Sequence, residues 1–157
     1  MKRLLIWGII SLLTICSAWS QNSIFKSLQK YDDVEFIQLD KSMLTAAFQA
    51  SAPGQDISAT TNLIEGLTVI IVDKDNKKAS KKAHSIILKK IVPEYTLKVS
   101  MEDKDLKSFI YAKELADGLN EYVTYTEEED DIVIAVMKGK MSSKEAKEMI
   151  KIDFKKK

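Results

Sequence analysis

Five consecutive carboxylates form the densest group of chemically capable side chains in this sequence. They occupy positions 127–131 as Glu127, Glu128, Glu129, Asp130 and Asp131. Charges of one sign packed this closely repel one another, and the repulsion attracts a cation or a basic partner. The competing interpretation is a solvated turn between two strands, because charge runs are commonly loops. We therefore treat the acidic run as a candidate interaction surface.

Tyrosines on neighbouring expected strands form a second group. Tyr111, Tyr122 and Tyr125 are placed to stack against a carbohydrate, and we add Tyr111 and Tyr125 to the candidate interaction surface. Cross-strand pairing inside a core is the competing interpretation, because aromatic rings pack well between strands. Both tryptophans, Trp7 and Trp19, fall in the first twenty residues, which weakens the case for a sugar site.

The other candidates for catalysis or metal binding favour structural roles. His84 is the sole histidine, so no second His is available for a zinc site, and no G-x-S-x-G elbow accompanies it. Asp73, Asp75 and Asn76 begin like a calcium loop, but Lys77 takes the next ligand position, so we expect a helix N-cap instead. The sequence therefore predicts no catalytic residue, no metal site and no cofactor.

Lysines surround the apolar stripe of the helix expected over residues 77–91. They could contact acidic lipid headgroups or an acidic polymer, although a solvated helix face explains them equally simply. The chain has 24 basic and 23 acidic residues, and this balance argues against nucleic acid as a partner. The lysines are Lys77, Lys78, Lys81, Lys82, Lys89 and Lys90.

The N-terminus has the features of a cleavable export signal. Lys2 and Arg3 precede an apolar run over residues 4–15, which is shorter than the roughly 20 residues of a membrane-spanning helix. We expect residues 1–20 to be a signal peptide, with the protein exported to the periplasm or secreted. No transmembrane segment is expected in the mature chain.

Cleavage after Ser20 is predicted by the small residues Ala18 and Ser20 at the −3 and −1 positions. Residues 21–157 then form a single domain, which is of ordinary domain size. Lipidation of Cys16, which would anchor an outer-membrane lipoprotein, is the alternative, but Ile15 is large for the position before a lipidated cysteine. Cys16 is the only cysteine, so the mature chain has no disulfide.

The elements that position these residues follow from apolar periodicity and turn residues. Helices interleave with the early strands, and the late strands are joined by short polar turns, as in an antiparallel meander. We predict an α+β two-layer sandwich, with a mixed, mostly antiparallel sheet of about five to six strands and helices on one face. Helices are expected over 23–31, 41–50, 58–65 (ending at Gly66), 77–91 and from Ser142, and strands over 34–39, 67–72, 95–101, 107–112, 121–126 and 132–137.

Several segments together resemble a known family. They are KYDDVEFIQLDKSML, IEGLTVIIVD with the lysine-rich helix after it, and IVIAVMKGKM before a last helix. Behind a basic and apolar leader, this arrangement resembles the small exported bacterial proteins known as domain of unknown function 4252, over nearly the whole mature length. The resemblance implies a periplasmic or secreted protein of the Gram-negative cell envelope, and it provides no catalytic residues.

We expect a non-enzymatic exported envelope protein that binds a protein or another envelope ligand. One alternative is a hydrolase or lyase that uses carboxylates alone, since pairs of Asp or Glu can perform acid–base chemistry. Another alternative is an accessory in envelope stress signalling, which the family resemblance implies through genes for alternative sigma factors nearby.

Overall fold

The computed structural model describes most of the chain from residue 24 to residue 145. The described residues are 24–51, 54, 58–142 and 144–145. The expected signal peptide and the expected last helix beyond Glu145, with Ala146, Met149 and Ile150, lie outside them.

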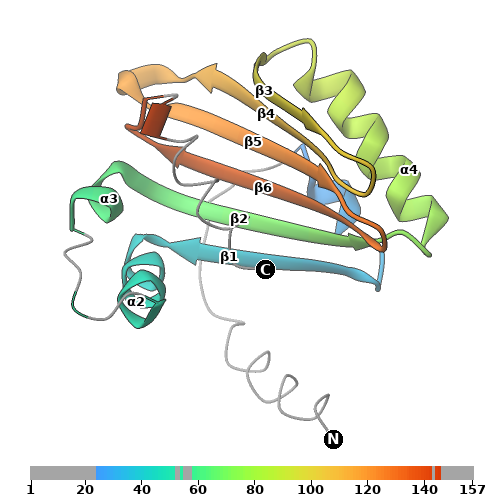
Figure 1. The fold of residues 1–157 in the computed structure, drawn as a ribbon, viewed down its shortest axis with the longest axis horizontal. Helices are drawn as coiled ribbons and strands as arrows, with labels where there is room; N and C mark the ends of the chain where they lie inside the picture. The colour runs from blue at the N-terminus through green and yellow to red at the C-terminus, as the bar shows by residue number, and fades with distance from the viewer. Residues whose placement is uncertain (1–23, 52–53, 55–57, 143, 146–157) are drawn as a thin grey trace, which may run out of the picture.

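One six-stranded sheet forms the body of the protein, with the strand order β1-β2-β6-β5-β4-β3 (Figure 1). Its strands are segments rich in β-branched and aromatic residues. The last four strands follow one another as antiparallel neighbours, which confirms the predicted meander. The strands are β1 (Val34–Asp40), β2 (Ile64–Asp73), β3 (Thr96–Glu102), β4 (Lys107–Glu114), β5 (Asn120–Glu127) and β6 (Asp131–Gly139).

Two helical connections determine the strand order. The helices α2 (Lys41–Ser51) and α3 (Ser58–Leu63) join the neighbours β1 and β2, whereas α4 (Lys77–Ile86) and the π-helical turn η2 (Ile87–Ile91) lead from β2 to the far edge. This second connection passes over β6, β5 and β4, so β2 and β3 are never neighbours. Every strand pair among the described residues is therefore antiparallel, and the parallel part of the predicted mixed sheet is not found there.

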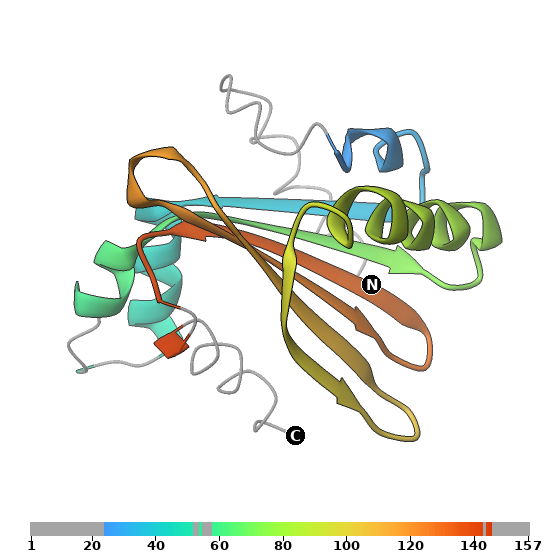
Figure 2. The same ribbon diagram turned by 90° about the horizontal axis from the view of Figure 1, so that it is seen from above.

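The main core lies between α4 and one face of the sheet. Ala79 and Ala83 are fully buried, and their small side chains let the helix approach the strands closely. The short 3-10 turn η1 (Lys26–Leu28) packs beside α4 and adds Phe25 and Leu28 to this core (Figure 2). These two layers confirm the predicted α+β sandwich.

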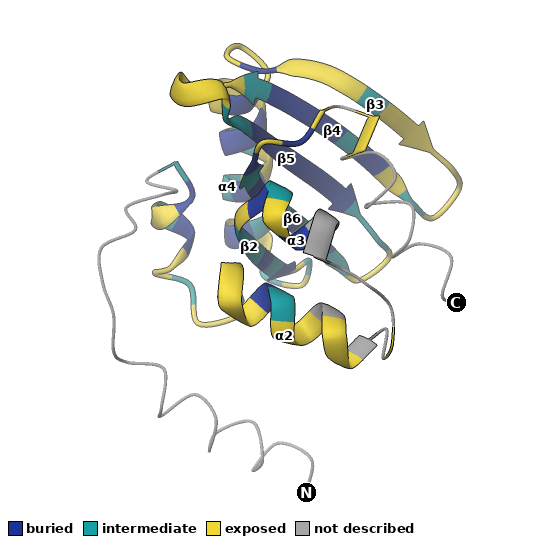
Figure 3. Cartoon of the chain, turned by 90° about the vertical axis from the view of Figure 1, so that its left-hand side faces the viewer, coloured by how far each residue is buried: buried dark blue, intermediate teal, exposed yellow. Residues whose placement is uncertain are grey.

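A smaller core lies on the opposite face, near one end of the sheet. Leu44 of α2 packs there with Ile64, Tyr122 and Met141. Figure 2 shows α2 and α3 on this side, and Figure 3 shows that much of α2 remains exposed. The prediction placed the helices on one face. Periodicity reveals that a helix has an apolar side but not which face of a sheet it covers, so the position of α2 differs from that expectation.

Two short helices are smaller than the sequence predicts. Within the segment expected to be helical over 23–31, only the 3-10 turn η1 forms. The helix expected over 58–65 ends at Leu63, and Gly66, expected to cap it, lies inside β2. A β-bulge between Ile64 and Gly66 lets the strand begin directly after the helix.

The apolar alternation of β3 does not give one buried face. Leu97 lies opposite Tyr111, on the α4 face, whereas Val99 lies opposite Ile110, on the other face, because a bulge separates them. Leu97 and Met101 are 49% and 44% exposed. A one-residue irregularity moves side chains to the other face, and sequence alternation does not report it.

Gly139 marks a close approach between β6 and the start of β2. A Cβ atom at this position would lie 2.0 Å from the main-chain oxygen of Leu63. The neighbouring N–H of Lys140 donates to the same oxygen at 2.8 Å, so the two chains are held together there. The site accepts only glycine without a backbone shift.

We predict that Gly139→Ala lowers the free energy of unfolding by about 2 kcal/mol or more, because the backbone must move to relieve the overlap. Gly66→Ala is the matched control, since its Cβ would lie 3.6 Å from the oxygen of Leu39, an ordinary contact. Urea denaturation of both variants checks this. Equal stabilities for the two variants would show that the contact is not tight.

Candidate functional site

An open groove of about 490 Å³ runs along one flank of α4. The helix forms one wall, and the ends of β5 and β6 form the other. Most of the lining surface belongs to carbon atoms, including the stems of lysines. The lining residues are Lys74, Lys77, Ser80, Lys81, His84, Ser85, Leu88, Lys89, Glu127 and Ile132.

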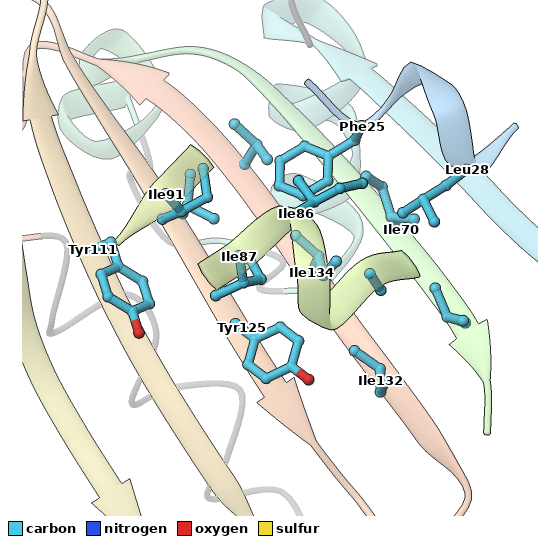
Figure 4. Close-up of a cluster of buried hydrophobic side chains, with 14 of the residues drawn as sticks. Phe25, Leu28, Ile70, Ile86, Ile87, Ile91, Tyr111, Tyr125, Ile132 and Ile134 are labelled. Carbon is cyan, nitrogen blue, oxygen red and sulfur yellow. The ribbon is translucent and has the colours of Figure 1, made fainter. Parts of the chain in front are cut away.

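Helical periodicity explains the wall that α4 provides. Lys77, Lys81, His84 and Leu88 are separated by four, three and four residues, so they share one side of the helix. Phe25 belongs to the core on the other side of α4. Figure 4 shows Phe25 and Leu28 on that side, and Tyr111 and Tyr125 on the side of the groove. One flank of α4 is therefore packed, and the other is open.

The π-helical turn η2 adds an apolar residue to this wall. The N–H of Val92 donates to the carbonyl of Ile87 at 2.9 Å, five residues back, which widens the turn. Ile87 and Ile91 are both buried, while Leu88 is 52% exposed and lines the groove. Pro93, which has no N–H, follows the helix. An exposed leucine beside lysines makes the wall both apolar and positively charged.

The acidic β5–β6 hairpin is attached to the start of α4 by main-chain bonds. The main-chain N–H of Lys74 donates to the carbonyl of Asp130 at 2.9 Å. The ammonium of Lys74 donates to the carbonyl oxygen of Glu128. Glu128 closes the turn by donating its N–H to Asp131 at 2.9 Å. These bonds hold Glu127 facing the lysine-bearing helix across the groove.

A chain of hydrogen bonds crosses the groove between its two walls. The Tyr125 hydroxyl donates to Glu127 Oε1 at 2.6 Å, and His84 Nδ1 lies 3.4 Å from the same hydroxyl oxygen. Because the phenol proton points to Glu127, the phenol oxygen is the acceptor for His84. The Tyr125 ring is only 3% exposed, so the core orients His84 through a rigid partner.

Burial is the main reason why the pKa of Tyr125 lies well above that of an exposed phenol, and its hydrogen bond to Glu127 adds to the rise. The phenol is therefore protonated at neutral pH and acts as a donor, not as a base. Burial also raises the pKa of Tyr111, which lies on the adjacent strand.

Lysines in the groove have no carboxylate partner. Within the described part of the chain the salt bridges are Lys113–Glu94 at 2.8 Å and Lys138–Glu121 at 3.1 Å. Neither involves a groove lysine. Four positive charges, those of Lys74, Lys77, Lys81 and Lys89, therefore stand along a concave apolar surface without a neutralising ion pair.

The predicted interaction surface is divided by the fold. Glu127 lines the groove, whereas Glu129 and Asp130 are exposed at the hairpin turn and Glu128 and Asp131 are half-buried beside it. The acidic run is thus a solvated turn with one member in the groove.

The tyrosines are divided in the same way. Tyr111 and Tyr125 are buried under α4, and Figure 4 shows both hydroxyl groups directed away from Phe25. Tyr122 lies on the opposite face, where its hydroxyl donates to the carbonyl of Met141 at 2.9 Å. The three rings share no exposed surface, so cross-strand and core packing describes them.

The Asp73–Asn76 turn caps α4. The Asn76 side chain accepts a hydrogen bond from the N–H of Ala79 at 3.0 Å, and Asp73 Oδ1 accepts one from the N–H of Asp75 at 2.7 Å. This is the N-cap that the sequence predicts. Among the described residues no group of three or more His, Cys, Asp or Glu side chains is placed to hold a metal ion.

Sequence reasoning missed a buried polar group at the other end of the main core. Glu121 is 5% exposed, forms its salt bridge with Lys138 and accepts a hydrogen bond from the Tyr95 hydroxyl. Burial, followed by this bond, raises the pKa of Tyr95 well above the ordinary phenol value. The two side-chain partners of Glu121 within the described segments are a lysine and a phenol, so the group fastens the chain after η2 to the sheet. Only the β5–β6 register brings Glu121 opposite Lys138.

We predict that stability falls above about pH 10, the pKa of an exposed phenol. The folded-state pKa of Tyr125 is raised, so its stabilisation is complete below that pH and is lost as the unfolded chain ionises first. In Tyr125→Phe the slope of unfolding free energy against pH should be smaller by up to about 1.4 kcal/mol per pH unit.

Urea denaturation between pH 8 and 11.5 measures both slopes. The loss of the Tyr125 hydrogen bond itself should cost about 1 kcal/mol at every pH below 9, which provides the baseline. Parallel curves for the two proteins above pH 10 would contradict the assignment.

Comparison with known proteins places the chain in a family. No helix among the described residues has the length and apolar character needed to span a membrane. The searches among curated proteins and solved structures found no match to this chain. The profile of the family described as Domain of unknown function (DUF4252) matches residues 25–149, which cover the sheet, α4 and the groove. The chain therefore belongs to this family.

Proposed function

We propose that the chain is a non-enzymatic, exported protein of the bacterial cell envelope, and that it binds its ligand in the groove beside α4. The observation that carries the proposal is the groove itself, in which unpaired lysines and an exposed leucine line one wall. Its volume of about 490 Å³ is within the range of binding sites for small ligands or short segments.

Binding is favoured over catalysis by the arrangement of the titratable groups. The Tyr125 hydroxyl donates to Glu127, but Tyr125 is buried and does not line the groove, and its raised pKa keeps it protonated, so it is a poor nucleophile for a ligand in the groove. Ser80 Oγ lies 3.4 Å from the carbonyl of Asp73 and donates to it, not to His84. Glu127 faces lysines, whereas acid–base hydrolysis by carboxylates needs a second carboxyl group across the site. No observation favours the hydrolase alternative.

Export is supported by the leader. The basic residues Lys2 and Arg3, the apolar run and Ala18 and Ser20 together form a signal peptide pattern. Intact mass measurement of the protein from an expressing Gram-negative host should find a chain that begins at Gln21. An intact Met1 form in the cytosol would contradict export, and an acylated Cys16 would identify a lipoprotein instead.

A bulky residue in the groove should abolish ligand capture. We predict that Ser85→Trp lowers recovery of the co-purified ligand at least tenfold, because the indole fills the groove beside Leu88. Lys78→Trp is the matched control, since it adds the same side chain to α4 outside the groove. Crosslinking in the expressing host, followed by affinity purification and mass spectrometry, compares the three proteins. Equal recovery from all three would exclude the groove as the ligand site.

A further inference from the structure

We infer that the groove binds an extended acidic peptide segment with an apolar residue near one end, supplied by a partner protein. The inference rests on the proposed function, because it identifies the ligand class of the same groove. It follows from three features of the groove: its charge, its open shape and the polar groups on its walls.

Charge identifies the sign of the ligand. Lys77 and Lys81 of α4 and Lys89 of η2 line the groove, and none of them forms a salt bridge with another described residue. Like charges along a concave, mostly apolar wall reinforce one another's potential and attract anions. Among the described residues that line the groove, Glu127 carries the one carboxylate, and it already accepts a hydrogen bond from the Tyr125 hydroxyl. The groove is thus positive over most of its length.

The shape favours a peptide over a lipid tail. The groove is open along its length, so a ligand lying in it keeps one side in water. An alkyl chain would leave half of its apolar surface wet, which forfeits much of the hydrophobic gain. An extended peptide normally has one polar side and one buried side, because successive side chains point in opposite directions.

The spacing of the wall residues matches an extended chain. Lys77 and Lys81 are about 6 Å apart along the helix axis, close to the separation of about 6.6 Å between alternate residues of a strand. Leu88 lies a further distance of about 10.5 Å along the axis from Lys81, between the spans of two and four residues of extended chain, about 6.6 and about 13 Å. Because alternate side chains of an extended chain share one side, the apolar residue stands an even number of positions from the acidic residues. The pattern that fits is an acidic residue, a spacer, a second acidic residue and an apolar residue four positions later, where the flexible lysine stem spans the difference.

The polar groups on the groove walls can form hydrogen bonds with the main chain of a peptide. Ser85 and His84 line the helix wall, and the Glu127 carboxylate lines the strand wall. A carboxylate accepts main-chain N–H donors, which a peptide has and a fatty acid lacks. The strand wall therefore favours a peptide over an anionic amphiphile through these main-chain donors.

The direct test uses a dansyl-labelled peptide Glu-Ser-Glu-Ser-Ser-Ser-Leu and the protein produced from the full-length chain. Fluorescence anisotropy at low salt should show binding at least tenfold tighter than that of the Gln-Ser-Gln-Ser-Ser-Ser-Leu peptide. Replacing the terminal leucine of the peptide by serine should also weaken binding several-fold. Equal binding of the Glu and Gln peptides would overturn the inference.

Charge reversal on α4 provides the matched comparison. Lys77→Glu with Lys81→Glu should weaken binding of the acidic peptide at least tenfold. Lys78→Glu with Lys82→Glu makes the same change in net charge outside the groove, and it should alter affinity less than twofold. Circular dichroism verifies that both proteins fold. The peptide Lys-Ser-Lys-Ser-Ser-Ser-Leu should bind the groove variant more tightly than the wild-type protein, a gain that misfolding does not produce.

Each contrary outcome has a distinct meaning. Equal weakening by both double variants would indicate non-specific attraction to a charged helix and would overturn the inference. Tighter binding of dodecanoate or of phosphatidylglycerol vesicles than of the peptide, with the same lysine dependence, would overturn it in favour of an amphiphile. If Ser85→Trp abolishes ligand capture while no acidic peptide binds, the proposed function stands and this inference falls.

Discussion

Burial of the apolar stripe of α4 against the sheet is the interaction on which the rest of the structure depends. Ala79 and Ala83 are completely buried, and Ile91 is buried at the far end of the same stripe. Each isoleucine removed from water contributes about 1.5–3 kcal/mol, and the mature chain predicted here has no disulfide to add to this. Since the stripe sets the height and rotation of α4, it also determines which lysines face the groove and which face bulk solvent.

The candidate site depends on this core through Tyr125. The ring belongs to the main core, whereas the hydroxyl joins Glu127 on one wall to His84 on the other. A change in packing under α4 would therefore alter the groove without touching a lining residue. The opposite end of the core is closed by Glu121, Lys138 and Tyr95, which bind one another instead of a ligand. Glu127 and His84 line the groove, whereas Glu121 and Tyr95 are buried. Because their burial differs, the polar groups at the two ends of the core have different roles.

Membership of a family without an assigned reaction leaves the site as the basis for functional argument. The sheet and α4 alone imply no activity, because one fold supports many functions. The groove lysines, which form no salt bridge among the described residues, are more informative about function than the fold is. Isolated surface ion pairs contribute little to stability, so their absence on this wall costs the fold little. In the proposed function these lysines contact the ligand, and the acidic hairpin opposite them limits which ligands would fit.

The sequence by itself determined the local elements, because these depend on neighbouring residues. Period-two segments became strands, Asn76 capped α4 and Pro93 followed its end, as predicted. The tertiary structure alone decided how distant segments meet. The bulge that sends Leu97 and Met101 to opposite faces, the pairing of Glu121 with Lys138 and the approach of His84 to Tyr125 all depend on register and packing. Such choices are made by residues far apart in the chain, and a pattern read along one segment contains no information about them.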